Sequence, residues 1–210
     1  MFTEERHRSR GYATKLMDLV AAAGDTQACV LYSDVGERIY ARSGYVPVPE
    51  PVDWVLAPEA GEVPSCEAAV PQLDAAPPRV LQLSPTREQL DWAWERERLY
   101  ARFLGRTPPS VHTARAGAAG AWWTASFKAN ELLVLWLTPG SSEETARVLE
   151  VARAVAQQCG LERVRLWGLP GLAPPPAASV QKRKEELAMF RPRNGLRIDA
   201  WRSVQRALWV

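Results

Sequence analysis

The sequence Arg8-Ser9-Arg10-Gly11-Tyr12-Ala13 lies a few residues after Met1 and begins an amphipathic helix. Small residues where a loop meets a helix let the backbone approach a ligand closely. The first turn of a helix offers unpaired N–H groups and the positive end of the helix dipole, and both favour a phosphate. The segment therefore predicts an anion-binding loop. The alternative interpretation of Gly11 and Ala13 is a helix start that needs small residues for packing.

Composition indicates one ordinary globular domain or two small ones. The chain has 210 residues, and 47% of them are hydrophobic, which is enough to form a core. The formal net charge is only +2, so no nucleic-acid partner is predicted despite the cluster of Arg6, Arg8 and Arg10. We interpret this cluster as a solvated loop that could also contact the 3′-phosphate of a nucleotide.

The sequence predicts no metal site, no disulfide framework and no membrane segment. The three cysteines lie far apart, and neither histidine has the spacing of a metal ligand. No apolar run is long enough to span a bilayer, and the acidic start of the chain is unlike a signal peptide. We therefore expect a reduced, cytoplasmic protein.

Periodicity predicts a helix, a strand, a second helix and a second strand in residues 1–56. The apolar run ACVLY at residues 28–32 is typical of a buried strand. Asp34 can cap the second helix, which carries Tyr40. Pro47 falls in the second strand and needs an edge position, since proline cannot donate to a sheet ladder. Residues 57–79 are rich in proline and alanine and are interpreted as a linker.

Residues 80–210 are interpreted as a second domain. We expect a long helix that ends at Gly105, a β-hairpin, a second long helix with a capping box at Ser141 and Glu144, and a half-buried strand at 163–167. A charged helix is then expected over residues 179–190, because its Lys and Glu residues stand four apart. Residues 196–201 are predicted to form the last strand.

The helix that ends at Gly105 carries two apolar faces. The second of them consists of Trp92, Leu99 and Phe103, so we expect the helix to be covered on two sides. Glu95 and Glu97 of the same helix are interpreted as part of a solvated face, and recognition of a lysine ammonium is their alternative role. Most of the tryptophans are expected in the core.

The two segments share an order of elements, which suggests two related half-folds in one chain. In the second segment the loop that corresponds to Arg8–Ala13 is Thr138–Glu144. Two carboxylates, Glu143 and Glu144, fall in the first helical turn, where they stabilise the helix but repel a phosphate. We therefore predict that the second loop has lost anion binding.

The segment Arg8–Ala13 resembles the R/Q-x-x-G-x-G/A acetyl-CoA loop of the GNAT superfamily of N-acetyltransferases. Downstream, Glu37–Tyr45 resembles the FYxxxGF segment of the same superfamily. The pattern LYSDVG at residues 31–36 narrows the resemblance to the fungal lysine N-acetyltransferase-like family, whose members carry a GNAT domain followed by a GNAT-like domain. The resemblance implies an α/β fold with a partial GNAT domain at 1–56 and a degenerate GNAT-like domain at 80–210.

This resemblance also implies roles for individual residues. Acetyl-CoA would be the co-substrate, with no metal, and the acceptor would be an amine such as lysine. Tyr40 matches the tyrosine that protonates the departing CoA thiolate, a role that suits a phenol because it stays protonated at neutral pH. A core tyrosine is its alternative interpretation. The residues that would bind acetyl-CoA are Phe2, Thr3, Arg8, Ser9, Arg10, Gly11, Tyr12, Ala13 and Thr14.

A GNAT domain has several strands and helices before its acetyl-CoA loop, whereas Met1–Glu5 alone precede the loop here. The sequence therefore resembles an N-terminally truncated form, and we expect the chain by itself to be a poor or inactive catalyst. The alternative function is a non-catalytic relic or interaction module of GNAT-like fold.

Overall fold

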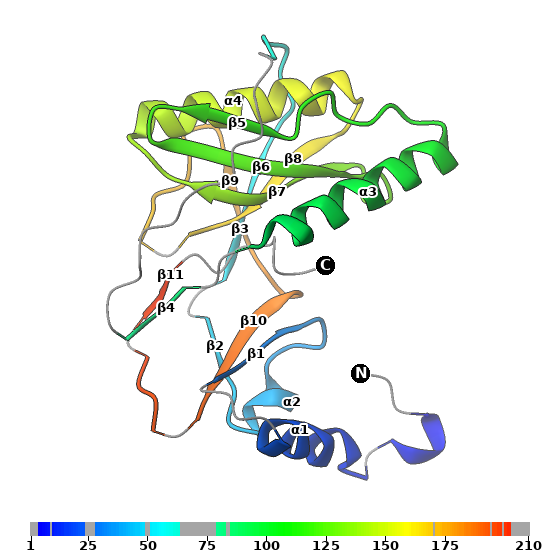
Figure 1. The fold of residues 1–210 in the computed structure, drawn as a ribbon, viewed down its shortest axis with the longest axis vertical. Coiled ribbons are helices and arrows are strands. Elements are labelled where there is room, and N and C mark those ends of the chain that lie inside the picture. The colour runs from blue at the N-terminus through cyan, green and yellow to red at the C-terminus, as the bar shows by residue number, and fades with distance from the viewer. Residues whose placement is uncertain are drawn as a thin grey trace. The chain divides into compact units, whose positions relative to one another are not determined.

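The computed structural model describes residues 4–8, 10–23, 28–48, 51–63, 79–82, 85–169, 171–193, 195–198 and 200–202. Helices and sheets alternate along the chain (Figure 1), so the predicted α/β class is confirmed. Contacts divide the chain into two compact units. Unit 1 consists of Met1–Pro51, Pro78–Val80 and Arg183–Trp201, and unit 2 consists of Val52–Pro77, Leu81–Lys182 and Arg202–Val210.

Unit 1 combines two helices with a three-stranded sheet of order β1-β10-β2, in which both pairings are antiparallel. The predicted edge position of Pro47 is confirmed, since β2 lies at one side of this sheet. A separate two-stranded sheet pairs β4 with β11, and each of these two strands has residues in both units. The elements are the short 3-10 helix η1 (Glu5–His7), α1 (Tyr12–Ala23), β1 (Ala28–Ser33), α2 (Arg38–Ala41), β2 (Val46–Pro47), β4 (Val80–Gln82), β10 (Leu187–Pro192) and β11 (Ala200–Arg202).

The charged helix expected over residues 179–190 does not form. Residues 179–182 and 187–192 are two strands, and Glu186 between them adopts a positive φ of 53°. The apolar residues 187–190 are all buried, because β10 is the central strand between β1 and β2. Burial of four side chains outweighs one exposed i,i+4 ion pair, which is worth only a few tenths of a kcal/mol. The last strand is also shorter than predicted and begins at Ala200.

The first strand and helix are less buried than their apolar sequences predict. Strand β1 lies at the edge of its sheet, and its residues 28–32 are only half-buried. On α1 only Ala21 is buried, while Leu16, Leu19 and Val20 are exposed. Asp34 does not cap α2 but accepts a hydrogen bond from the backbone N–H of Glu186 at 3.2 Å. Strand β1 and Asp34 therefore have their partners in the distant segment 186–192, which contains β10.

Unit 2 is built on a six-stranded sheet of order β5-β6-β7-β8-β3-β9. Strands β7 and β8 are parallel, and the other neighbours are antiparallel. The predicted hairpin corresponds to β6 and β7, and the predicted strand 163–167 is β8. The elements are β3 (Val52–Leu56), α3 (Arg87–Leu104), β5 (Thr113–Ala116), β6 (Ala119–Ser126), β7 (Glu131–Thr138), α4 (Ser142–Gln158), β8 (Arg163–Trp167) and β9 (Ser179–Lys182).

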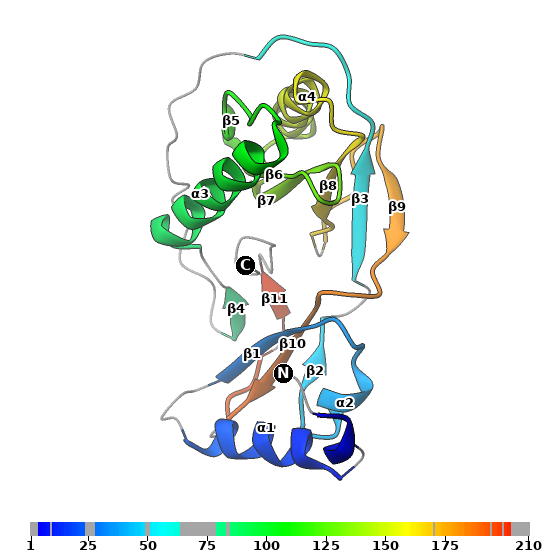
Figure 2. The ribbon, with the colours of Figure 1, turned by 90° about the vertical axis from the view of Figure 1, so that its right-hand side faces the viewer.

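Each face of the unit 2 sheet has its own core, and the two helices lie on opposite faces (Figure 2). Alternation along β7 divides its apolar residues, so that Leu132 and Val134 belong to one core and Leu133 and Leu135 to the other. The α4 side forms the larger core, and the α3 side packs Trp94 against β6 and β7. Both helices begin with capping boxes, at Thr86 and at the predicted Ser141.

The two units do not follow the linear boundaries expected at residues 56 and 80. Residues 52–56 are expected in the first domain, yet they form β3, which lies between β8 and β9 in the sheet of unit 2. Residues 187–192 are expected in the second domain, yet they form β10, the central strand of the sheet in unit 1. Most of unit 2, residues 52–77 and 81–182, is therefore inserted into the chain of unit 1 between β2 and β10.

Candidate functional site

The predicted anion-binding loop connects η1 to α1. Arg8 and Arg10 are exposed in this loop, and α1 begins at Tyr12. Tyr12 is half-exposed, and its ring meets that of His7 edge to face at 6.1 Å. Ala13 and Thr14, in the first turn, are half-buried. Three of the predicted site residues, Phe2, Thr3 and Ser9, lie outside the described residues.

Gly11 has a left-handed conformation and open surroundings. Its φ of +74° lies in the left-handed region that favours glycine, and its carbonyl accepts the N–H of Lys15 at 3.0 Å as the helix begins. A Cβ placed on Gly11 would meet no atom within 4 Å, so the backbone is open to an external group. The first turn of α1 contains no acidic residue. An anion placed here would meet the N–H groups of a first turn that carries no carboxylate of its own.

Helix α1 is held to unit 1 by few contacts. The guanidinium of Arg191 in β10 donates a hydrogen bond to Asp18 of α1 at 3.1 Å. Burial, together with the nearby Cys29 thiol, raises the pKa of Tyr45, which lies at the start of β2. Figures 1 and 2 show α1 alongside the three-stranded sheet of this unit. The loop is thus carried by a helix whose position depends on β10.

Tyr40, the predicted catalytic residue, lies on α2 and is half-buried. Its ring packs edge to face against Tyr45, with centroids 6.2 Å apart. The backbone carbonyl of Tyr40 accepts the N–H groups of Ser43 and Tyr45, so that α2 ends in a turn at Gly44, whose φ is +78°. Among the described residues, the Tyr40 side chain forms no hydrogen bond with the loop. The structure thus keeps Tyr40 and the Gly11 loop in one unit but on separate elements.

The corresponding loop in unit 2 contains its own carboxylate. Glu144, in the first turn of α4, accepts the backbone N–H of Ser141 at 2.8 Å. A Cβ placed on either Gly117 or Gly140 would overlap the Glu144 side chain, so this carboxylate fills the space between the two loops. The Ser141 N–H holds the pKa of Glu144 below its usual value. These contacts agree with the prediction that the second loop has lost anion binding.

Sequence reasoning missed a buried polar cluster around Glu97 of α3. Its carboxylate is completely buried and meets Nε2 of His112 at 2.7 Å. The hydroxyl of Thr124 donates to it at 2.9 Å, and the backbone N–H of Ala125 also donates to it. Glu97 is therefore not part of a solvated face. The one sequence signal was its position on the same side of the helix as Leu90, Ala93 and Ala101.

A second network joins the strands of unit 2. Glu131, buried at the start of β7, accepts from Arg163 at 3.0 Å and from Arg165 at 2.6 Å. Arg165 also lies 3.6 Å from Asp53 of β3. These pairs link β7, β8 and β3, and they explain the alternation of arginines in β8 by structure rather than by ligand binding.

Within the part of the chain that the structure describes, no group of three His, Cys, Asp or Glu could hold a metal ion. A search of the same residues finds no helix long and apolar enough to cross a membrane. A hollow of about 480 Å³ lies between residues 59–62 and α4, and Glu59, Glu62 and Glu150 line it together with Arg147. Its carboxylates make it unsuitable for a phosphate.

Comparison with known families identifies a family for this chain. The family model described as the LYC1 GNAT-like C-terminal domain matches residues 71–194, which is more than half of the chain. The match covers most of unit 2 and continues through β10, and it does not include the Arg8–Ala13 loop. A search of curated proteins found no similar sequence.

Several solved structures are similar to this chain. A GCN5-related N-acetyltransferase from Kribbella flavida is 15% identical, covers 90% of this chain and 49% of its own, and has a TM-score of 0.44. A conserved Enterococcus faecalis protein, described as a probable N-acyltransferase, is 13% identical with coverages of 90% and 52% and a TM-score of 0.43. A GCN5-related N-acetyltransferase from Anabaena variabilis is 15% identical with coverages of 89% and 52% and a TM-score of 0.44. The chain spans about half the length of these structures.

Proposed function

Because this chain belongs to the family of the LYC1 GNAT-like C-terminal domain, we propose that it serves an N-acetyltransferase that transfers an acetyl group from acetyl-CoA to an amine. Unit 1 would bind acetyl-CoA, and unit 2 would serve as a GNAT-like unit without its own cofactor. The acceptor would be lysine or a related amino acid, in keeping with the resemblance of residues 31–36.

The observation that carries this proposal is the open, left-handed Gly11 before a helix whose first turn holds no acidic residue. Backbone N–H groups at the start of α1 would bind the pyrophosphate of acetyl-CoA, and Arg8 and Arg10 would add positive charge. The contrast with unit 2 supports this assignment, since Glu144 fills the corresponding loop there.

Acetyl-CoA, when bound, supplies an activated acetyl group for nucleophilic attack by an amine. The residues of this chain would hold its phosphates and keep a proton available for the sulfur of the departing CoA. Tyr40 would hold that proton, since its phenol lies on α2 in the same unit as the loop. A phenol in this role contributes about a hundredfold or more to turnover.

Calorimetric titration with acetyl-CoA tests the binding step. We expect the intact chain to bind and the Gly11→Glu variant to lose measurable binding, because the new carboxylate would meet the phosphates. Gly105→Glu is the matched control, since Gly105 also has a positive φ of 60° and no neighbour within 4 Å of an added Cβ, but it lies in unit 2. No binding by the intact chain, or equal loss in both variants, would refute the assignment.

Release of CoA in the presence of lysine tests turnover separately. In a chain that turns over, Tyr40→Phe should lower the rate about a hundredfold without changing acetyl-CoA binding. Tyr100→Phe, on the exposed part of α3, is the control and should keep the rate. Binding without release of CoA, whatever the amine, would favour the alternative of a non-catalytic module.

A further inference from the structure

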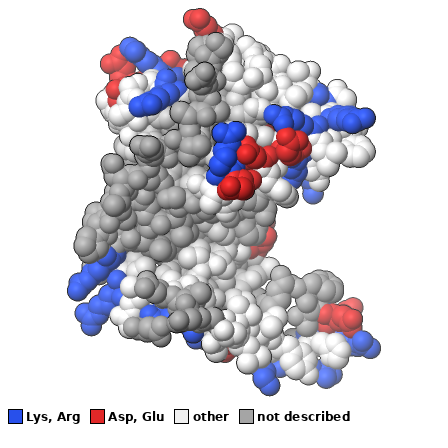
Figure 3. Space-filling model, viewed as in Figure 1, with Lys and Arg blue, Asp and Glu red and all other residues white. Residues whose placement is uncertain are grey.

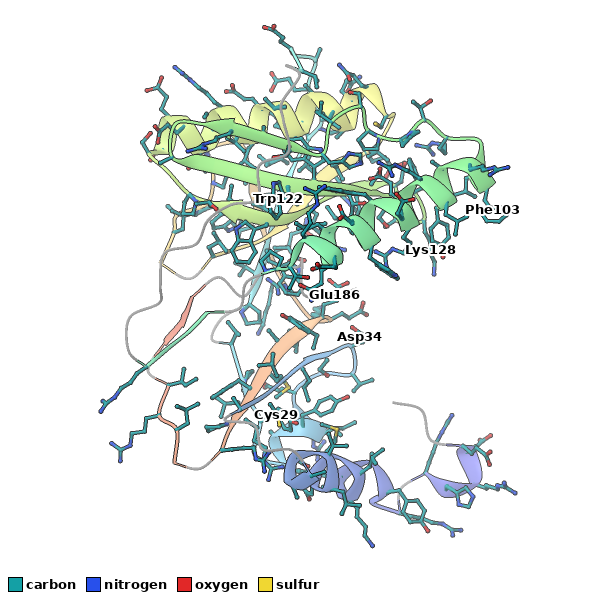
Figure 4. All side chains as sticks on the ribbon, in the orientation of Figure 1. Cys29, Asp34, Phe103, Trp122, Lys128 and Glu186 are labelled. Carbon is teal, nitrogen blue, oxygen red and sulfur yellow. The ribbon has the colours of Figure 1, made fainter. Side chains whose placement is uncertain are left out.

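The outer side of α3 carries an apolar stripe opposite its buried face. Trp92, Leu99 and Phe103 follow one another at spacings of seven and four residues, so they line one side of the helix. They are 51%, 54% and 78% exposed, although all three are large and apolar. Figure 4 shows the Phe103 side chain directed away from the sheet at the end of α3. The predicted cover on this side is therefore absent among the described residues.

Isolated apolar side chains on a surface need no explanation, but a continuous stripe does. Tyr100 and Leu104, both more than half exposed, widen the stripe at its C-terminal end. Arg96 stacks over the Trp92 ring at 4.6 Å, which leaves the tryptophan and a guanidinium together at the surface. Tryptophan, tyrosine and arginine are the residues that most often carry the binding energy of protein interfaces.

Charges along α3 change sign from one end to the other. The N-terminal half, residues 87–95, has three exposed or half-exposed carboxylates and one arginine. The C-terminal half, residues 96–104, has three arginines, and its single carboxylate, Glu97, is buried. Figure 3 shows acidic atoms together with basic ones over the first part of this helix and basic atoms at its far end. Two such helices placed antiparallel would match each acidic half with a basic half.

We propose that the Trp92–Leu99–Phe103 stripe is a dimer interface, and that its partner is α3 of a second copy of this chain. An antiparallel pair is self-complementary, as a two-fold interface requires. The 18-residue helix is about 27 Å long, so the contact is modest, and the dimer should form in a concentration-dependent way. The same charge pattern disfavours a parallel pair, because like charges would then face each other.

Sedimentation of the full chain over a range of about 5 to 500 µM tests the proposal. The weight-average mass should rise from 23.3 kDa toward twice that value. Phe103→Glu should weaken dimerisation at least tenfold, while its thermal unfolding stays close to that of the wild type because the side chain is exposed. Leu19→Glu, which introduces the same charge at an exposed leucine of α1, is the matched control and should leave the dimer intact.

Charge reversal tests the electrostatic pairing of the two α3 helices independently of the apolar contact. A variant with Glu88→Lys and Glu95→Lys keeps Asp91 but gives the helix a net positive charge, and a variant with Arg98→Glu and Arg102→Glu keeps Arg87 and Arg96 but gives it a net negative charge. Each alone should be monomeric, and an equimolar mixture should form a heterodimer that weakens with salt.

A monomer at every concentration would overturn the proposal. So would a dimer that Phe103→Glu leaves intact, or two charge variants that do not associate. If the chain is monomeric and hydroxyl-radical footprinting shows Phe103 protected, the stripe is covered by another part of the same chain, and the proposal fails in that case too.

Discussion

Val52 and Lys182 lie opposite each other on the neighbouring antiparallel strands β3 and β9. Pro51 precedes Val52 and Arg183 follows Lys182, and the N–H of Arg183 donates a hydrogen bond to the carbonyl of Pro51 at 2.9 Å. The segment 52–182 of the chain therefore begins and ends at adjacent points. This geometry is typical of an inserted unit, which can be removed without separating the ends it leaves behind.

Residues 52–182 should consequently fold as an independent fragment. They contain all six strands of the larger sheet, both long helices and both cores. We expect a single cooperative thermal transition and dispersed amide resonances in two-dimensional NMR. The control is the fragment 80–210, cut at the boundary that the sequence alone suggests. It lacks β3, which lies between β8 and β9, and should unfold at a lower temperature. A better-folded 80–210 fragment would contradict the insertion.

Local signals predicted most elements of unit 2, but they did not predict how the chain is divided between the two units. The capping box at Ser141 and the hairpin around residues 128–131 depend on neighbours in sequence, and both formed as expected. Strand β10 depends on partners more than 140 residues away in β1 and β2, so its short apolar run looked like part of a helix. Nothing local distinguishes a buried central strand from one side of a helix over four residues.

The candidate site remains a prediction, and its residues differ in how local their signals are. The left-handed conformation of Gly11 is a local property of a glycine where a helix begins. The buried cluster at Glu97 joins α3 to His112 and to β6 through long-range contacts, and the residue types alone did not indicate it. A charged residue on a helix is interpreted as exposed to solvent unless the sequence also indicates which side of the helix packs against the sheet.

Removing the Glu97 carboxylate should destabilise unit 2 strongly. Glu97→Ala leaves His112, the Thr124 hydroxyl and the Ala125 N–H without their common acceptor inside the protein. We expect a loss of about 3 kcal/mol in the free energy of unfolding, measured by urea denaturation. Glu97→Gln keeps the shape and one acceptor oxygen and should lose less, about 1 kcal/mol.

Glu95→Ala provides the comparison, because Glu95 lies two residues away on the exposed side of α3 and pairs with Arg98 at the surface. It should change stability by no more than about 0.5 kcal/mol. If Glu95→Ala costs as much as Glu97→Ala, the loss reflects the helix as a whole and not the buried cluster.

Acid should weaken the start of α4. The Ser141 N–H, with further help from the Ser141 hydroxyl and Arg147, holds the pKa of Glu144 below its ordinary value of 4.5. A lowered folded-state pKa means that the ionised group contributes stability above pH 4.5, and that this contribution is lost as the pH falls through the folded-state pKa. The difference in Tm between wild type and Glu144→Gln should therefore shrink as the pH falls from 7 to about 3.

Glutamine at position 144 can still accept the Ser141 N–H, so this substitution isolates the charge from the capping hydrogen bond. Glu143→Gln, in the same helical turn and paired with Arg147 at 2.5 Å, controls for the loss of a surface carboxylate. A Tm difference for Glu144→Gln that stays constant with pH would show that the carboxylate charge does not stabilise this helix.

Cys159, at the C-terminal end of α4, should be an unusually slow nucleophile. Burial and, to a smaller extent, the Glu97 carboxylate raise the pKa of its thiol to about 11, although Arg106 opposes the shift. At pH 8 the thiolate fraction is then roughly 100-fold below that of an ordinary cysteine. Alkylation by iodoacetamide, followed at Cys159 by mass spectrometry, should be slower than in a peptide of residues 155–162 by about that factor.

The pH profile separates this electrostatic effect from simple obstruction of a half-buried sulfur. A raised pKa predicts a rate that keeps rising about tenfold per pH unit up to about pH 9.5, whereas the peptide rate levels off above about pH 8.5. Arg106→Gln removes the opposing positive charge and should slow the reaction further. A profile that levels off with the peptide's would mean that access, and not the thiol pKa, limits Cys159.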